Sequence, residues 1–365
     1  MLERAASEDQ VARLRLIRSD NIGPVTYFQL LARFGSASAA LDAIPDLAAR
    51  GGGRVPKLAS RAAVEREMEE VARLGARYLF LGQGLYPPLL AEIETAPPAL
   101  IVRGHLSLLD KPVIALVGAR NASAAACRFA RMLAQELGAA GATIVSGLAR
   151  GIDTAAHDGS LESGTIAVIA GGIDIFYPPE NEDRQRAIAE RGLLIAEQPP
   201  GVEPRARHFP YRNRIIAGLA QGTVVVEAAP RSGSLITARY ATEFGRDVMA
   251  VPGSPLDPRA QGCNQLIREG ATLIQNAEDV LETIRPFALR PLAQKGLDYR
   301  APAASPDTSE AERRIVADLL SPTPVSVDEI IRQSGLPPAA VQTVLLELEL
   351  AGRLERHAGG RVSLV

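Results

Sequence analysis

The sequence predicts a doubly wound α/β sheet as the centre of this 365-residue chain. From Val113 onward, short apolar runs rich in β-branched residues alternate with helical stretches, which is typical of parallel strands joined by right-handed crossovers. The runs contain no alternating polar positions, as expected of strands that are covered on both faces. We predict strands over residues 113–117, 143–145, 165–170, 193–196, 223–227, 248–251 and 272–275.

Helical segments precede this sheet. A helical pattern over residues 9–43 is interrupted by Asn21-Ile22-Gly23-Pro24, where glycine permits a turn and proline begins the next helix. Two helices joined by a hairpin are therefore expected. Gly51-Gly52-Gly53 is interpreted as a flexible break, and residues 57–74 again favour a helix. The predicted domains are an N-terminal helical domain with its connection over 1–104 and the sheet domain over 105–285.

The remaining residues predict a linker and a third domain. Residues 286–308 are rich in Pro, Ala, Ser and Gln without periodicity, as in a linker. Within 309–365, three helices and two short strands around Gly359-Gly360 predict a winged helix-turn-helix. Its third helix, Pro337 to Leu350, carries Glu347 and Glu349 but no Lys or Arg, which is a poor surface for an anionic groove. We expect this domain to contact protein.

The composition limits the possible functions. With a formal net charge of -2, a nucleic-acid site must come from local clusters of Arg. Cys127 and Cys263 lie far apart and form no ligand pattern with the four histidines, so neither a metal nor a disulfide is expected. The sequence shows no signal peptide and no apolar run of about 18 residues, so a cytoplasmic protein without a membrane partner is expected. Because Trp is absent, only a few bases could be stacked.

Small residues follow most of the predicted strands, at the edge where open α/β sheets bind ligands. Glycine and serine there let backbone N–H groups approach a phosphate, although tight turns also need glycines. Neither G-x-G-x-x-G nor G-x-x-x-x-G-K-[ST] is present, so NAD and ATP are not expected, and no cofactor is predicted. The loops concerned are Gly118 to Ser123, Ser146 to Gly151, Gly171-Gly172, Arg231 to Ser234 and Pro252 to Ser254.

The strongest positive cluster lies between Arg205 and Arg214, a stretch without any acidic residue. We expect Arg212-Asn213-Arg214 to open a helix over 212–221, so that guanidinium and helix N–H groups face one anion. Phe209 and Tyr211 are interleaved with the arginines and could stack on bases without reading their identity. The alternative is that these arginines pair with Glu197, Glu203 or Glu227.

Residues for catalysis are harder to find. Asp153 and His157 stand four residues apart on a predicted helix, where such pairs commonly only hydrogen-bond and orient the helix. Glu227 and Ser234 are not accompanied by a nucleophile elbow or a triad pattern. We therefore predict no catalytic residue and no enzymatic activity.

A series of motifs between about residues 85 and 280 resembles the DNA-processing protein A (DprA/Smf) family. These motifs are Ser146 to Asp153 with Ala156-His157, Gly171-Gly172, Tyr177-Pro178, Phe209 to Gly218, Ser232 to Ala238 and Val251 to Gly253. The resemblance implies an extended Rossmann-like, mostly parallel sheet flanked by a SAM-like or helix-hairpin-helix-like N-terminal domain and a winged-helix domain. It also implies a homodimer that binds single-stranded DNA, protects incoming DNA and loads the RecA recombinase during natural transformation, without catalytic turnover.

Family DNA contacts carry over to a defined set of residues in this chain. One departure is Ala119, where a hydroxyl residue is frequent in the family, so the side chain at this position cannot hydrogen-bond to a phosphate. The predicted DNA-binding residues are Gly118, Arg120, Ser146, Gly147, Gly151, Phe209, Arg212, Asn213, Arg214, Ser232, Gly233, Ser234 and Thr237.

Two other classes of function remain open. Nucleoside-monophosphate phosphoribohydrolases share the general architecture, but their P-G-G-x-G-T stretch is replaced here by residues Arg231 to Thr237. A regulator of double-stranded DNA built on the winged helix is the other alternative, which the acidic third helix disfavours.

Overall fold

The computed structural model describes residues 2–288, 308–357 and 359–365. These residues form two compact units. One contains the residues up to Arg66 together with those from Thr308 onward, and the other runs from Glu67 to the end of the last helix before the undescribed stretch. The predicted linker over 286–308 lies mostly outside the described residues. No helix among the described residues is long and apolar enough to cross a membrane.

A nine-stranded sheet forms the centre of the second unit within the described residues, in the order β1-β2-β6-β5-β4-β3-β7-β8-β9. Strands β3 to β9 pair in parallel, and β1 and β2 are added antiparallel beside β6. The mostly parallel, doubly wound sheet is therefore confirmed. The strands are β1 (Arg77–Phe80), β2 (Ala99–Gly104), β3 (Val113–Gly118), β4 (Thr143–Ser146), β5 (Thr165–Ile169), β6 (Leu193–Ala196), β7 (Gly222–Val226), β8 (Asp247–Ala250) and β9 (Thr272–Leu273).

All seven strands that the sequence predicts are present, but β1 and β2 are additional. Both come from the segment before Gly104, which the prediction placed in the N-terminal domain. The connection predicted there contains prolines at 87, 88, 97 and 98. Instead, β2 begins directly after Pro98 and buries its first four residues, because it pairs with β6.

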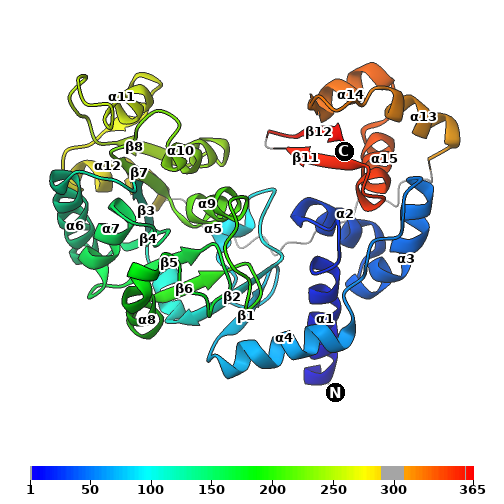
Figure 1. Ribbon diagram of the computed structural model, residues 1–365, viewed down its shortest axis with the longest axis horizontal. Coiled ribbons are helices and arrows are strands. Elements are labelled where there is room, and N and C mark those ends of the chain that lie inside the picture. Colours follow the sequence, from blue (N-terminus) through cyan, green and yellow to red (C-terminus); the bar gives the residue numbers. More distant parts are fainter. Residues whose placement is uncertain (1, 289–307, 358) are drawn as a thin grey trace. The chain divides into compact units, whose positions relative to one another are not determined.

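Helices cover both faces of the sheet (Figure 1). On one face, α6, α7 and α12 pack against Ile114 and Leu116 of β3 and against Val224 of β7 in one apolar cluster. On the other face, α9 and α10 pack against each other and against β3 and β7. The helices of this unit are α4 (Arg61–Arg73, shared with the first unit), α5 (Pro88–Ala91), α6 (Ala124–Ala139), α7 (Ile152–Ser160), α8 (Glu182–Arg191), α9 (His208–Leu219), α10 (Gly233–Glu243), α11 (Gln261–Arg268) and α12 (Ala277–Ala288), with short 3-10 turns η1 (Leu106–Asp110) and η2 (Pro179–Asn181).

The first unit combines the N-terminal helices with the winged helix. Three helices stand where two were expected, because Gly35 adopts a left-handed φ of 75° that ends α2, and the Ser36 side chain caps α3. The predicted winged helix is confirmed, with a third strand β10 added to its hairpin. The elements are α1 (Leu2–Ile17), α2 (Pro24–Phe34), α3 (Ala37–Arg50), α13 (Glu310–Asp318), β10 (Val325–Ser326), α14 (Val327–Ser334), α15 (Pro338–Leu350), β11 (Leu354–His357) and β12 (Arg361–Leu364).

Candidate nucleic-acid interface

A cavity of about 360 Å³ opens at the carboxyl edge of the sheet. Its walls come from the loops after β3, β4 and β5 and from the first turns of α9. Open α/β sheets bind their ligands at this edge. Four of the predicted DNA-binding residues line the cavity, namely Arg120, Gly147, Phe209 and Arg212.

Arg120 and Phe209 lie side by side in this wall. The guanidinium carbon of Arg120, an exposed residue, lies 5.1 Å from the centre of the half-buried Phe209 ring. The ring of Tyr177 lies 5.5 Å from that of Phe209, tilted by 54°. A cation beside two aromatic rings provides the groups that bind a phosphate and stack on a base.

Tyr177 is a member of the site that the sequence did not predict. The residue is 45% exposed and lines the cavity beside Phe209. A signal was available, because an aromatic residue before a proline follows the third predicted strand. That position at the carboxyl edge of the sheet is where a stacking ring would be expected.

Arg212 occupies a different position from the one expected. Helix α9 begins at His208 rather than at residue 212, because Pro210 is accommodated within the first turn, where its missing N–H needs no partner. Arg212 is therefore in the second turn and only 6% exposed. Its Nη1 donates to the carbonyl oxygens of Gly147 and, at 2.6 Å, Val168. Burial lowers the pKa of Arg212 to about 10, although nearby Asp153 opposes this shift.

Asn213 and Arg214 also point into the protein. Asn213 accepts a hydrogen bond from Arg212 Nε and donates one of 3.2 Å to the Gly233 carbonyl oxygen at the start of α10. Arg214 is 3% exposed and forms an ion pair of 2.6 Å with Glu197. This pairing is the alternative that the sequence left open, and the expected single surface of Arg212, Asn213 and Arg214 is not found.

The exposed cations lie before this helix and in other loops. Arg205 and Arg207 are exposed and, among the described residues, form no ion pair. Arg120 and Arg231 are also exposed and form no ion pair with any residue that the structure describes. Arg150, which also lines the cavity, pairs with Glu180. The exposed positive charge without an ion-pair partner therefore comes from the residues before α9 and from two other loops, and not from Arg212 and Arg214.

Three further predicted residues shape the strand ends and do not line the cavity. Ser146 is fully buried and donates a hydrogen bond of 2.6 Å to the Leu116 carbonyl oxygen. A Cβ atom on Gly118 would lie 1.9 Å from the Val226 carbonyl oxygen. Gly151 has a φ of 74°, and a Cβ atom there would lie 2.3 Å from the Ala119 carbonyl oxygen. Close backbone packing explains why these positions are small.

The remaining predicted residues lie in the first turns of α10 or directly before it, and they do not line the cavity. Ser232 and Ser234 share a hydrogen bond of 2.8 Å between their hydroxyl oxygens. Gly233 is exposed, and no atom lies within 4 Å of the position that a Cβ atom would take there. Ser234 and Thr237 are 7% and 1% exposed, so their side chains face the protein interior.

Asp153 and His157 serve the interior of the sheet domain. Asp153 accepts a hydrogen bond of 3.2 Å from the Ala149 N–H, and burial raises its pKa. His157 is 1% exposed, its Nδ1 lies 2.8 Å from Thr165 Oγ1, and burial lowers its pKa to about 3. Neither residue lines the cavity.

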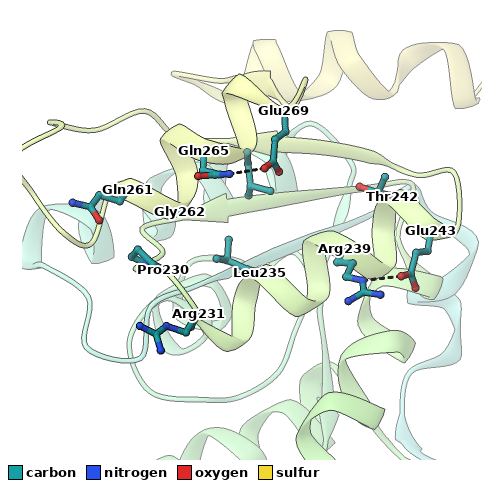
Figure 2. Close-up of a pocket in the computed structure, with 11 residues that line it drawn as sticks. Pro230, Arg231, Leu235, Arg239, Thr242, Glu243, Gln261, Gly262, Gln265 and Glu269 are labelled. Atoms are coloured by element: carbon teal, nitrogen blue, oxygen red, sulfur yellow. Dashed lines mark hydrogen bonds and ion pairs between the residues drawn. The ribbon is translucent and has the colours of Figure 1, made fainter. Parts of the chain in front are cut away.

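A second, larger cavity of about 590 Å³ lies between α10 and α11 (Figure 2). It contains none of the predicted DNA-binding residues. The charged side chains on its walls are partly satisfied within their own helices, since Arg239 pairs with Glu243 at 2.8 Å and Gln265 Nε2 donates to Glu269 at 2.6 Å.

We predict that Arg214 contributes to stability through its buried ion pair. Replacing Arg214 by Ala should lower the free energy of unfolding by about 3 kcal/mol, because a buried ion pair is broken. Arg239→Ala is the matched control, because the exposed Arg239 to Glu243 pair is worth less than about 0.5 kcal/mol. Urea unfolding measures both changes, and equal values for the two variants would contradict the prediction.

We also predict a pH dependence from His157. Because burial lowers its pKa to about 3, the unfolded chain binds a proton below about pH 6.5 that the folded chain does not bind. The free energy of unfolding should therefore fall as the pH drops from about 6.5 toward 3, by up to about 1.4 kcal/mol per pH unit from this group. Asp153 acts with the opposite sign. Urea titrations of the parent and His157→Asn should show a flatter dependence in the variant; parallel curves would refute the assignment.

Models of known families match the chain in three segments. The model of DNA recombination-mediator protein A matches residues 77–285, that of a DprA-like N-terminal HHH domain matches 7–69, and that of a DprA winged helix domain matches 300–360.

Individual proteins that carry the names DprA and Smf are also similar to the chain. The chain is 50% identical over 198 residues to DNA processing protein DprA of Streptococcus pneumoniae, covering 54% of this chain and 70% of that protein. It is 40% identical over 290 residues to protein Smf of Escherichia coli, covering 76% and 75%. The X-ray structure of the S. pneumoniae protein matches with a TM-score of 0.59 at 40% identity, over 68% of this chain and 82% of that one.

A structure of DNA processing protein A from Helicobacter pylori, described for its single-stranded DNA binding mode, matches with a TM-score of 0.53 at 28% identity, over 58% of this chain and 96% of that one. The central family model alone covers more than half of the chain, with the flanking domains in the corresponding order. The chain belongs to the DNA recombination-mediator protein A family.

Proposed function

We propose that this chain binds single-stranded DNA, without sequence preference, in the cavity at the carboxyl edge of the sheet. The observation that carries the proposal is the exposed guanidinium of Arg120 beside the Phe209 ring at the cavity wall. A phosphate would pair with Arg120 while a neighbouring base stacks on Phe209 or Tyr177. Stacking needs an unpaired base and tolerates any base, because every base has a π-face.

The charge distribution supports the same site. With a net charge of -2, the protein as a whole does not attract DNA, so the unpaired arginines must provide the attraction locally. Arg205 and Arg207 are exposed immediately before α9, whose second turn reaches the cavity. The relative from H. pylori, whose structure was described for its single-stranded DNA binding mode, supports the ligand class.

Family membership supports a role as a recombination mediator. We infer that the chain works in the cytoplasm as a homodimer, protects incoming single strands, and loads the RecA recombinase onto them during natural transformation. We also infer that it performs no catalytic turnover.

We predict that Arg120→Ala and Phe209→Ala each weaken binding to single-stranded DNA. Removal of a charged hydrogen bond at Arg120 should cost about tenfold in affinity, and removal of stacking about 1–3 kcal/mol per base. Arg120→Ala should also reduce the slope of log affinity against log salt by about 0.7 for each phosphate that is no longer neutralised. Titration of labelled oligothymidine and of a mixed-sequence oligonucleotide at several salt concentrations measures both effects.

Arg191→Ala is the control for these titrations. Arg191 is exposed, like Arg120, but it precedes β6 and so lies at the opposite, amino edge of the sheet. Its replacement should leave the affinity unchanged. Unchanged binding by Arg120→Ala and Phe209→Ala at matched salt would rule out the proposed site.

We predict that the chain shortens the delay before RecA hydrolyses ATP on single strands coated with single-strand-binding protein. Arg120→Ala should shorten this delay less, in proportion to its weaker DNA affinity, because the mediator must first hold the strand. The same delay with and without the protein would argue against RecA loading, while leaving the DNA site itself to the titrations.

The enzymatic alternative makes a different prediction. Both carboxylate oxygens of Glu227, at the end of β7, accept hydrogen bonds from Ser123, at 2.8 Å from its N–H and 2.6 Å from its hydroxyl. This acidic residue after β7 is thus engaged within the chain. Incubation with the common nucleoside monophosphates, followed by chromatography, should yield no free base above the blank; release of base would favour the enzyme.

A further inference from the structure

Helix α15 exposes almost none of its surface. From Val341 to Leu350 every residue is buried or half-buried, and the exposed residues are confined to the first turn, at Pro338 and Ala339. In a helix-turn-helix protein that reads DNA, the recognition helix must present a face to the major groove. Helix α15 presents no such face within this unit.

Apolar side chains from the N-terminal helices cover it. Leu346 and Leu350 of α15 are 3% and 0% exposed and lie in the same apolar cluster as Leu30 of α2 and Leu47 of α3. Burying a leucine contributes about 1.5–3 kcal/mol relative to leaving it in water. The cluster therefore contains residues of both segments.

The backbones of the two segments also approach closely. A Cβ atom on Gly51 would lie 2.1 Å from the Glu347 carbonyl oxygen, and one on Gly53 would lie 2.2 Å from that of Ala351. The sequence predicted a break at these glycines, and α3 does end at Arg50, but Gly51 and Gly53 pack closely against α15. They follow α3 directly and let the chain pack against the C-terminal turns of α15.

Polar contacts surround the apolar cluster. Gln29 Nε2 donates to Gln342 Oε1 at 2.9 Å, and Asn21 Nδ2 donates to the Leu350 carbonyl oxygen at 3.4 Å. Arg353 Nη1 donates to the Gly51 carbonyl oxygen at 3.2 Å. The contact is thus polar at its margin and apolar at its centre, as a specific protein interface is.

The two acidic residues of α15 form ion pairs within the same unit. Glu347 is fully buried and pairs at 2.8 Å with Arg313 of α13. Glu349 pairs at 2.8 Å with Arg356 of β11, so this arginine of the wing is already engaged by a carboxylate. The two acidic residues of α15 do not face a groove; they hold neighbouring elements in place.

We propose that α15 is a docking helix whose partner is the N-terminal helical segment of the same chain, formed by α2, α3 and the stretch Gly51 to Gly53. Duplex DNA is not its ligand. In this arrangement the winged helix covers and stabilises the N-terminal helices, and the sheet unit binds DNA. This inference does not depend on the proposed function of the cavity.

The first test disrupts the docked helix in the full chain. Leu350→Asp should lower the melting temperature by more than about 5 °C, because a charge replaces a fully buried side chain. Val365→Asp is the matched control in the same unit, since Val365 is 84% exposed, and it should melt like the parent. Affinity for single strands should stay within about twofold, and affinity for duplex DNA should not rise in either variant.

Two results of this test would overturn the proposal. One is a Leu350→Asp protein that melts like Val365→Asp, because the docked helix would then contribute nothing to stability. The other is a gain in duplex affinity on undocking, because α15 would then be a masked DNA reader.

The second test keeps the helix docked and does not depend on how Leu350→Asp folds. The variant carries Gln29→Cys, Gln342→Cys and Cys127→Ala. Its two new thiols replace side chains that share a hydrogen bond, so a short bismaleimide can bridge them. The bridge should form within one chain and leave single-strand affinity within about twofold of either single-cysteine control. Bridging only between chains, or a tenfold drop in affinity on bridging, would refute the proposal.

Discussion

The arrangement of the cavity depends on the buried guanidinium of Arg212. Moving a guanidinium out of water is costly unless its N–H groups find acceptors, and here two carbonyl oxygens and the Asn213 side chain accept them. Those carbonyls belong to Gly147 and Val168, so one side chain joins the loop after β4, strand β5 and helix α9. A Cβ atom on Gly147 would lie 2.1 Å from Arg212 Nη1, which explains the glycine.

This interaction separates two kinds of arginine within ten residues of sequence. Arg212 and Arg214 hold the framework, whereas Arg205 and Arg207 remain exposed at the surface. Preorganised loops cost a ligand little ordering free energy when it binds. A small number of unpaired arginines also releases few counterions, which suits a protein proposed to hold a strand and then pass it on.

The sequence predicted the sheet well because parallel strands that are covered on both faces form continuous apolar runs, which Val113 to Val117 and Val224 to Val226 illustrate. It located the cluster of arginines, but it did not reveal which of their side chains face solvent and which face the interior. Successive residues on a helix point about 100° apart, so Arg212, Asn213 and Arg214 cannot all face one ligand. The predicted helix start was also wrong, because a proline within a first turn resembles a boundary. Burial and pairing of this kind depend on distant partners such as Glu197, which local patterns do not reveal.

The packing of α15 on the N-terminal helices has a consequence for biosynthesis. Asn21 and Leu350, which share a hydrogen bond, are separated by 329 positions. At about 5–20 residues per second, a ribosome needs about 16–66 s to make that intervening length. During this interval α2 and α3 have emerged while the helix that covers their leucines has not yet been made. Chaperones that shield apolar surface on nascent chains would therefore be expected to act on the N-terminal helices first.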